Sequence, residues 1–270
     1  MLLNGYMGVE MLVIGDVHGC LQTLLALLEQ VPARRRQRLC FTGDLIDRGP
    51  RSREVVEFVI GGGYDCVLGN HEAMLVAALG PHGGLARVLD SPEGDWLEAG
   101  GNGYITGSRD VWLYNGGRRT LHSYGLLGER QQPRLETLRE HLEWMKELPI
   151  IREYPEVITP EGRHLVVSHS LCQNFYRRLQ SGDPYAREMA KEAILWRRDF
   201  AAIRDAGFYN VIGHSPFSSK PRITKIYANI DTGAYFGCQA AAESNKPPEP
   251  GYLTALHVPS MTVYQQQCVD

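Results

Sequence analysis

The sequence has no long apolar run and no strong excess of charge of either sign. None of its segments reaches the roughly 20 apolar residues that a membrane-spanning helix needs. Its first residues also lack a basic stretch followed by an apolar one, so we expect no signal peptide, no membrane partner and a cytoplasmic location. The formal net charge is −3 over 270 residues, which gives no basic field for holding DNA.

The six cysteines also lack the spacing of a known metal-binding or disulfide motif. They stand at positions 20, 40, 66, 172, 238 and 268, with no C-x-x-C pair and no compact spacing. In a chain this long we interpret them as reduced, mostly buried thiols. Cys20 and Cys172 fall next to the candidate site described below, and a small packing residue is the favoured interpretation for both.

Apolar residues are abundant enough for a full-sized core, because 43% of the sequence is hydrophobic. The length suits one undivided α/β domain, so we predict a single domain over residues 1–270. Helices are predicted over 21–31, 50–60, 72–79, 133–148 and 184–203. Further strands are predicted over 225–230, 253–258 and 261–265.

Three similar units organise the first third of the chain. Each has a short apolar run, a glycine turn with polar residues and then a helix-like segment. The turns are Gly-Asp-Val-His-Gly at 15–19, Gly-Asp-Leu-Ile-Asp-Arg-Gly at 43–49 and Gly-Asn-His-Glu at 69–72. Two later apolar runs end in the same way, at His169 and at His214. In an open α/β sheet such turns converge on one crevice at the carboxyl ends of the strands.

The side chains at these turns are typical of a metal site. Asp16 and His18 are two residues apart on an extended turn, so they point the same way and can bind one cation. Asp44 offers a carboxylate that can bridge to a second cation. The remaining candidate ligands are Asn70, His169 and His214. A mixed oxygen and nitrogen set suits Mn²⁺, Fe²⁺ or Zn²⁺ better than Ca²⁺.

Two cations about 3.5–4 Å apart can clamp a phosphoryl group and activate water, lowering its pKa from 15.7 toward about 7. That shift corresponds to roughly 12 kcal/mol, more than an unassisted side chain supplies. His71 follows a candidate ligand and is placed to protonate a leaving alkoxide. Asp47 can orient that ring and raise its pKa, and Arg48 offers a planar fork for phosphate oxygens.

Taken together and in this order, the motifs resemble the metallophosphoesterase superfamily and, within it, the phosphoprotein phosphatase branch. That branch includes bacterial and phage Ser/Thr phosphatases and symmetrical diadenosine tetraphosphatases. The resemblance runs from about residue 11 to residue 256. It implies an α/β fold in which two mixed sheets lie between helical layers. It also implies two divalent cations, with Mn²⁺ favoured.

The resemblance assigns roles residue by residue. One cation would be held by Asp16, His18 and Asp44, and His71 would be the general acid, with Asp47 as its partner. Arg48 would bind phosphate. The second cation would be held by Asp44, Asn70, His169 and His214. The Leu-Trp-Arg-Arg stretch at 195–198 resembles the place of a second phosphate-binding arginine, for which Arg198 fits better than Arg197.

At two places the sequence differs from other branches of the superfamily. Eukaryotic protein phosphatases carry a Tyr-containing loop where this chain has Asp231-Thr232-Gly233, so their groove is not carried over. The sequence at 213–216, Gly-His-Ser-Pro, also lacks the second histidine of the nuclease and phosphodiesterase branches. Residues 80–130 are rich in glycine and aromatics, including Trp112 and Tyr114, and are predicted to form a loop-rich cap that selects substrate.

The favoured function is a protein serine/threonine phosphatase, because Asp47-Arg48 and His71-Glu72 are intact. The alternative is a dinucleoside polyphosphate hydrolase or an enzyme that removes nucleotide caps from RNA, with cap aromatics stacking on the base. A silent binding scaffold is disfavoured, since every expected ligand is present. The substrate, a phosphoprotein or a nucleotide phosphoester, stays open, as do the native metal and the oligomeric state.

Overall fold

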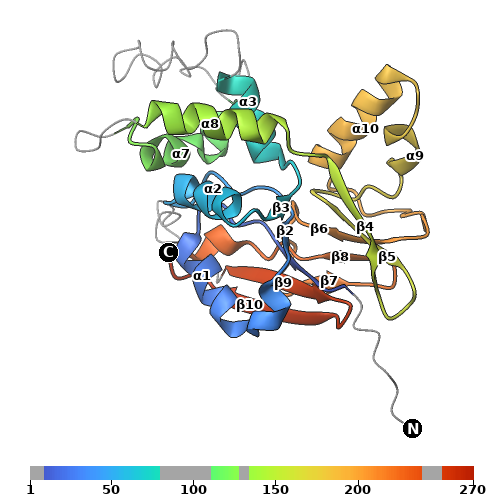
Figure 1. Ribbon diagram of the computed structural model, residues 1–270. Helices are drawn as coiled ribbons and strands as arrows, with labels where there is room; N and C mark the ends of the chain where they lie inside the picture. The colour runs from blue at the N-terminus through green and yellow to red at the C-terminus, as the bar shows by residue number, and fades with distance from the viewer. Residues whose placement is uncertain (1–8, 80–110, 128–133, 239–250) are drawn as a thin grey trace.

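Two β-sheets form the centre of the molecule (Figure 1). The computed structural model describes residues 9–79, 111–127, 134–238 and 251–270. The first sheet, in spatial order, contains β10 (Thr262–Gln267), β9 (Tyr252–Val258), β1 (Met11–Ile14), β2 (Leu39–Phe41) and β3 (Asp65–Cys66). The second contains β4 (Ile151–Ile158), β5 (His164–Ser168), β6 (Tyr209–Ile212), β8 (Tyr227–Asn229) and β7 (Arg222–Ile223).

Helices cover the outer faces of both sheets (Figure 1). The helices on the side of the first sheet are α1 (Leu21–Gln30), α2 (Ser52–Gly61), α3 (Asn70–Leu79), α7 (Arg118–Ser123) and α8 (Leu135–Lys146). Those on the side of the second sheet are α9 (Tyr176–Leu179) and α10 (Pro184–Trp196). Short helical turns lie at η1 (Ala33–Arg36), η2 (Leu113–Gly117) and η3 (Ala234–Gly237).

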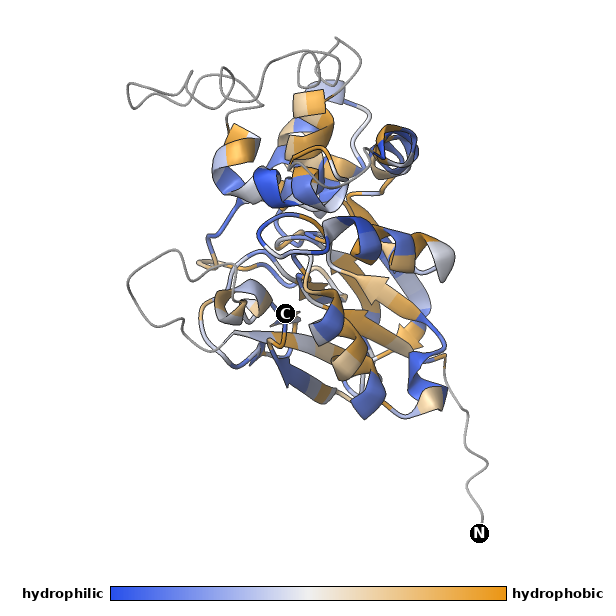
Figure 2. Cartoon of the chain, turned by 90° about the vertical axis from the view of Figure 1, so that its left-hand side faces the viewer, coloured by the Kyte–Doolittle hydropathy of each residue, from blue (hydrophilic) through white to orange (hydrophobic). Residues whose placement is uncertain are grey.

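The alternation of side chains along each strand produces these layers. In β1, Leu12 and Ile14 pack into the core beneath α1 and α2, whereas Met11 and Val13 pack between the two sheets. Val166 of β5 faces α10 in the same way. Most central strands are accordingly apolar in Figure 2, whereas the edge strand β10 and the helices carry polar residues. The predicted fold class, two mixed sheets between helical layers, is confirmed.

Strand direction places the functional turns at one edge. β1, β2 and β3 run parallel, and so do β5, β6 and β8, while β9, β10, β4 and β7 are antiparallel to their neighbours. The carboxyl ends of parallel strands meet at the same edge of a sheet. The glycine turns after β1, β2 and β3 therefore lie together, opposite the turns after β5 and β6.

The structure differs from the sequence predictions in several elements. The helix predicted over 184–203 ends at Trp196, because Arg197 is already extended (φ −74°, ψ 133°). The strand β4 was not predicted, since Pro155 interrupts it and its register shifts between Tyr154 and Ile158. The loop-rich cap is wrong over 111–123, which is helical. Residues 80–110 and 128–130 of that cap lie outside the described residues.

No helix in the described part of the chain is long and apolar enough to cross a bilayer. A cytoplasmic location and a single domain over residues 1–270 stay predictions.

Asp270 caps the first helix from the far end of the sequence. Its Oδ1 accepts from the Gln22 N–H (3.1 Å), and its Oδ2 accepts from the Thr23 N–H (2.9 Å) and hydroxyl (2.7 Å). Cys20, at the N-cap position, makes no side-chain cap of its own. Asp270 therefore satisfies helix donors that would otherwise lack a partner.

The first prediction concerns this cap. Replacing Asp270→Ala is expected to lower the free energy of unfolding by about 0.5–2 kcal/mol, the usual effect of losing an N-cap. Urea denaturation followed by circular dichroism measures the change. Glu140→Ala, on the exposed face of α8, is the control and should change stability by no more than about 0.5 kcal/mol. Equal effects of the two substitutions would contradict the capping role.

Candidate metal centre and active site

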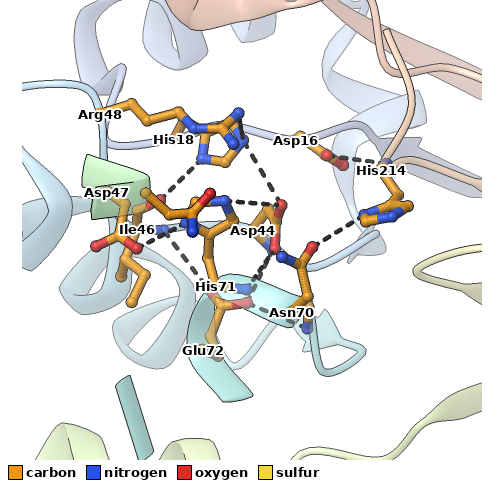
Figure 3. Close-up of polar contacts among 12 residues, drawn as sticks. Asp16, His18, Asp44, Ile46, Asp47, Arg48, Asn70, His71, Glu72 and His214 are labelled. Atoms are coloured by element: carbon orange, nitrogen blue, oxygen red, sulfur yellow. Dashed lines mark hydrogen bonds and ion pairs between the residues drawn. The ribbon is translucent and has the colours of Figure 1, made fainter. Parts of the chain in front are cut away.

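The candidate residues predicted from the sequence converge at the strand ends (Figure 3). Arg198 follows α10, and the others come from the turn after β1, the turn after β2, the first turn of α3 and the ends of β5 and β6. All except Arg48 and Arg198 are almost fully buried. The buried residues are Asp16, His18, Asp44, Asp47, Asn70, His71, His169 and His214.

The backbone at this site is held in unusual conformations. Among the described residues, seven other than glycine have positive φ, and five of them belong to this site. They are His18, Asp44, Asp47, Arg48 and His214. Each such conformation costs about 1–3 kcal/mol, and they cluster where function requires a fixed side-chain direction. The strain is therefore concentrated at the candidate functional residues.

Glu72 stabilises the turn that carries Asp44. Its buried carboxylate accepts N–H groups from Asp44 (2.9 Å), Leu45 (2.8 Å), Ile46 (3.3 Å) and Gly69 (3.1 Å). Burial raises the pKa of Glu72 to about 7, and the nearby Asp44 carboxylate adds to that shift. The sequence showed Glu72 directly after His71 but gave no reason to assign it this supporting position.

Asp44 lies at the middle of the site. Its carboxylate oxygens are 3.5 Å from Nε2 of His169, 3.6 Å from Nε2 of His18 and 3.9 Å from Nε2 of His71. In the described part of the chain, two groups of potential ligand atoms share Asp44, each with its atoms within 4.8 Å of one another. One contains His18 and His71, and the other contains His169 and His214. A carboxylate shared by two groups is the arrangement needed to bridge two cations.

Backbone carbonyls fix which nitrogen of three imidazoles faces the centre. A carbonyl oxygen only accepts, so the ring nitrogen beside it carries the proton and the other nitrogen presents a lone pair. The pairs are His18 Nδ1 with Ile46 (2.9 Å), His169 Nδ1 with Thr42 (2.8 Å) and His214 Nε2 with Trp196 (3.2 Å). Burial lowers the pKa of all three rings, which keeps them neutral and able to bind a cation.

Three acceptors therefore face one another without a donor. Oδ1 of Asn70 is 2.8 Å from Nε2 of His169 and 2.9 Å from Nδ1 of His214, and the two nitrogens are 3.0 Å apart. No proton is available for any of these contacts, so a cation is what would satisfy them. Oxygen and imidazole donors in this arrangement fit a transition metal such as Mn²⁺, Fe²⁺ or Zn²⁺.

Asp16 is close to this centre, but its contacts differ from those expected of a cation ligand grouped with His18 and Asp44. Its Oδ1 accepts from the Thr42 hydroxyl and its Oδ2 from the His214 N–H, both at 2.9 Å. A Cβ at Gly213 would lie 1.9 Å from Oδ1, so only glycine permits this approach. Burial raises the pKa of Asp16, as do the carboxylates of Asp231 and Asp44. His71 rather than Asp16 completes the group around His18 and Asp44.

Asp47 and His71 form a buried pair beside this centre. The Nδ1 of His71 donates to Oδ2 of Asp47 at 2.7 Å, and the same carboxylate accepts from the indole of Trp112 (3.0 Å) and the hydroxyl of Thr120 (2.6 Å). Burial alone would lower the pKa of His71, but the Asp44 and Asp47 carboxylates raise it above its ordinary value. The pKa of the ring thus lies above its ordinary value, and its Nε2 is 3.9 Å from an oxygen of Asp44.

Sequence reasoning missed Trp112 and Thr120, because they lie 65 and 73 residues from Asp47. Trp112 was assigned to the substrate-selecting cap, whereas it is fully buried and donates to Asp47. No local pattern around it predicts a hydrogen bond to a distant turn.

The two arginines at 197 and 198 face in different directions. Arg197 forms an ion pair with Asp199 at 3.0 Å and lies over the ring of Phe175, outside the site. The charge of Arg198 acts on the pKa values of His169, His214 and Asp231, so it lies near the centre.

Arg48 lies on the other side of the centre. Its guanidinium is 4.3 Å from the centroid of the Tyr235 ring, and one nitrogen donates to Nε2 of His18 at 3.1 Å. Arg48 therefore lies beside His18 at the edge of the centre.

Comparison with known protein families now adds to this geometry. Residues 10–192 match the family described as calcineurin-like phosphoesterase, which is well over half of the chain. The chain belongs to this family. Calcineurin-like phosphoesterases hydrolyse phosphoric esters at a centre of two metal ions, so the chain is a phosphoric ester hydrolase and its aspartate and histidine groups can bind metal.

Known members resemble the chain to different extents. It is 27% identical to the bis(5'-nucleosyl)-tetraphosphatase PrpE [asymmetrical] of Halalkalibacterium halodurans, over 92% of this chain and 90% of that protein. It is 44% identical to the symmetrical bis(5'-nucleosyl)-tetraphosphatase of Klebsiella pneumoniae, but over only 31% and 33% of the two chains. A solved structure named provisionally as a diadenosine tetraphosphatase has a TM-score of 0.54 at 17% identity, covering 98% of this chain and 96% of that one. The last comparison shows the shared fold.

The second prediction concerns metal-linked stability. Mn²⁺ at 100 times its dissociation constant should raise the free energy of unfolding by about 2.7 kcal/mol, since the folded state alone provides the converging acceptors. Asp44→Asn removes the shared charge and should lose most of that gain. Thermal unfolding with and without Mn²⁺ measures both. Asp205→Asn, a surface residue paired with Arg163, is the control and should keep the full Mn²⁺ response. An Asp44→Asn protein that is still stabilised equally would rule out the shared-ligand role.

Proposed function

We propose that the chain hydrolyses dinucleoside tetraphosphates such as diadenosine tetraphosphate, using a centre of two divalent cations that share Asp44. The chemistry rests on one observation, the convergence of unprotonated imidazole nitrogens and amide and carboxylate oxygens around Asp44. The substrate rests on the likeness to the asymmetrical tetraphosphatase, which extends over nearly the whole of both chains. This ranking differs from the one that the sequence favoured.

Each cation has its own set of proposed ligands. Asp16 and His18 would hold the first and Asn70, His169 and His214 the second, with Asp44 common to both. Mn²⁺ is the cation we propose, with Fe²⁺ or Zn²⁺ as alternatives that the same donors accept. When bound, the two cations supply charge that stabilises the transferring phosphoryl group and lower the pKa of water.

The chain's own residues complete the reaction. His71, protonated and oriented by Asp47, donates its Nε2 proton to the leaving oxygen. Arg48 and Arg198 bind the non-bridging phosphate oxygens, as planar guanidinium groups do. Trp112 and Thr120 donate to Asp47 and so hold its carboxylate against Nδ1 of His71.

A cavity beside the centre is suited to a base. It measures about 760 Å³, within the range of pockets that bind small ligands. Apolar side chains line most of it, together with Trp196, two lysines (Lys146 and Lys191) and two glutamates (Glu188 and Glu192). Trp196 connects it to the centre, because its carbonyl accepts from His214. The Trp196 ring offers a stacking surface for a base, which favours a nucleotide, while Lys146 is paired with Glu143 and Lys191 with Glu188.

A protein serine/threonine phosphatase is the second candidate, and the Asp47–His71 pair favours it. A serine or threonine alkoxide is strongly basic and needs a proton as it leaves, whereas a nucleotide leaves as a weakly basic phosphate. The 2.7 Å contact that raises the pKa of His71 is therefore more valuable for a phosphomonoester.

The third prediction tests the substrate. With Mn²⁺ present, kcat/KM should be at least tenfold higher for diadenosine tetraphosphate than for a phosphothreonine peptide. Chromatography of the products identifies the bond broken, since ATP with AMP indicates asymmetrical cleavage and two ADP molecules symmetrical cleavage. A preference for the peptide would overturn the nucleotide assignment and restore the phosphatase.

The same assay also tests whether the cavity beside the centre binds a base. Trp196→Ala keeps the backbone carbonyl that His214 needs, and removes a stacking surface worth about 1–3 kcal/mol per base. KM for the dinucleotide should rise by roughly 5- to 150-fold, with little change for p-nitrophenyl phosphate, which has no base. Tyr185→Ala, an exposed aromatic on the same helix and outside the cavity, is the matched control and should change neither value.

The fourth prediction concerns His71 as the general acid. Asp47→Asn should lower turnover of a phosphothreonine peptide by about 10²- to 10⁴-fold. The loss should be much smaller for p-nitrophenyl phosphate, whose leaving group needs no proton. The active, protonated form of His71 is present below its pKa and is lost as the pH rises through it. Because the carboxylate raises that pKa, the variant's alkaline limb of kcat/KM should move to lower pH. An unmoved limb would show that His71 is not the acid.

A further inference from the structure

Three cysteines form a cluster that the sequence did not indicate. The sulfur atoms of Cys20, Cys238 and Cys268 all lie within 4.8 Å of one another. Cys20 precedes α1, Cys238 follows η3 and Cys268 follows β10, so three separate segments bring the thiols together. Cys20 and Cys238 are buried, while Cys268 is partly exposed.

The remaining cysteines behave differently. Cys40, Cys66 and Cys172 each belong to an apolar cluster of the core, as small packing residues do. Among the described residues, those apolar clusters include neither Cys20 nor Cys238, although both are buried. Packing therefore explains three of the cysteines and leaves the clustered three without that explanation.

The separation of the sulfur atoms suits a cation. Zn²⁺ binds thiolates at about 2.3 Å in tetrahedral geometry, which places neighbouring sulfur atoms about 3.8 Å apart. A cluster within 4.8 Å can reach that spacing through small side-chain rotations. The partial exposure of Cys268 gives the ion an entry path and leaves its fourth position to solvent.

We propose that Cys20, Cys238 and Cys268 form a third metal site, separate from the phosphoesterase centre, that binds one thiophilic cation such as Zn²⁺. The site joins segments that also contact that centre. Cys20 is two residues after His18, and η3 carries Tyr235, whose ring lies 5.0 Å from the His18 ring and beneath Arg48. A bound cation would hold these segments in place, and the proposal does not depend on which substrate is hydrolysed.

Cobalt is the probe that separates this site from the other. The full-length protein, reduced and saturated with Mn²⁺, is titrated with Co²⁺. Sulfur-to-cobalt charge-transfer absorption in the near ultraviolet arises only from thiolates, and the phosphoesterase centre has none. The wild-type protein should give one equivalent of this signal. Excess Zn²⁺ should remove it.

Two variants and one further measurement decide the outcome. Cys268→Ser changes the partly exposed member and should reduce the signal to background, whereas Cys172→Ser, in its own apolar cluster, should retain it. If Cys268→Ser fails to fold, the wild-type protein still decides, because Zn²⁺ should protect Cys268 from alkylation by iodoacetamide. No thiolate signal in the wild-type protein, an unchanged signal in Cys268→Ser, or a disulfide between two of the three cysteines with no cation bound would overturn the proposal.

Discussion

The carboxylate of Asp44 lies within 3.9 Å of three imidazole nitrogens in a site with almost no access to solvent. Most of the local structure can be understood as the means of holding it there. A buried carboxylate beside the neutral rings of His18 and His169 is unfavourable unless further positive charge is added. The site therefore has the character of a receptor for cations, and the strained backbone of His18, Asp44 and His214 is consistent with that role.

Two layers of contacts support this centre. Glu72 accepts four backbone N–H groups and fixes the turn on which Asp44 stands. Trp112 and Thr120 fix Asp47, which in turn orients His71. The carboxylates of Glu72 and Asp47 act through other residues, and neither needs to contact a substrate. The position of the proposed acid thus depends on helical segments far away in the sequence.

Much of the fold followed from local patterns. Apolar runs ended by glycine turns predicted the strands β1, β2 and β6, and an apolar run ended by Ser168-His169 predicted β5, because the alternation of side chains is set by the extended backbone itself. The edge strand β4 was missed, since Pro155 breaks its pattern and only pairing with β5 makes it a strand. The helix at 184 was predicted to be too long, because its apolar periodicity continues past the residue at which the backbone turns to reach the site.

The sequence by itself determined which chemical groups are available and at which turns they stand. Asp16, His18, Asp44, Asn70, His71, His169 and His214 were all named as candidate site residues from motifs, because strand ends bring polar side chains to one edge of a sheet. Only the tertiary structure decided which side chains touch. The hydrogen bond from Trp112 to Asp47 and the meeting of three cysteines are long-range contacts. These contacts depend on how helices and sheets pack, and no pattern within a short stretch of sequence encodes which distant residues meet.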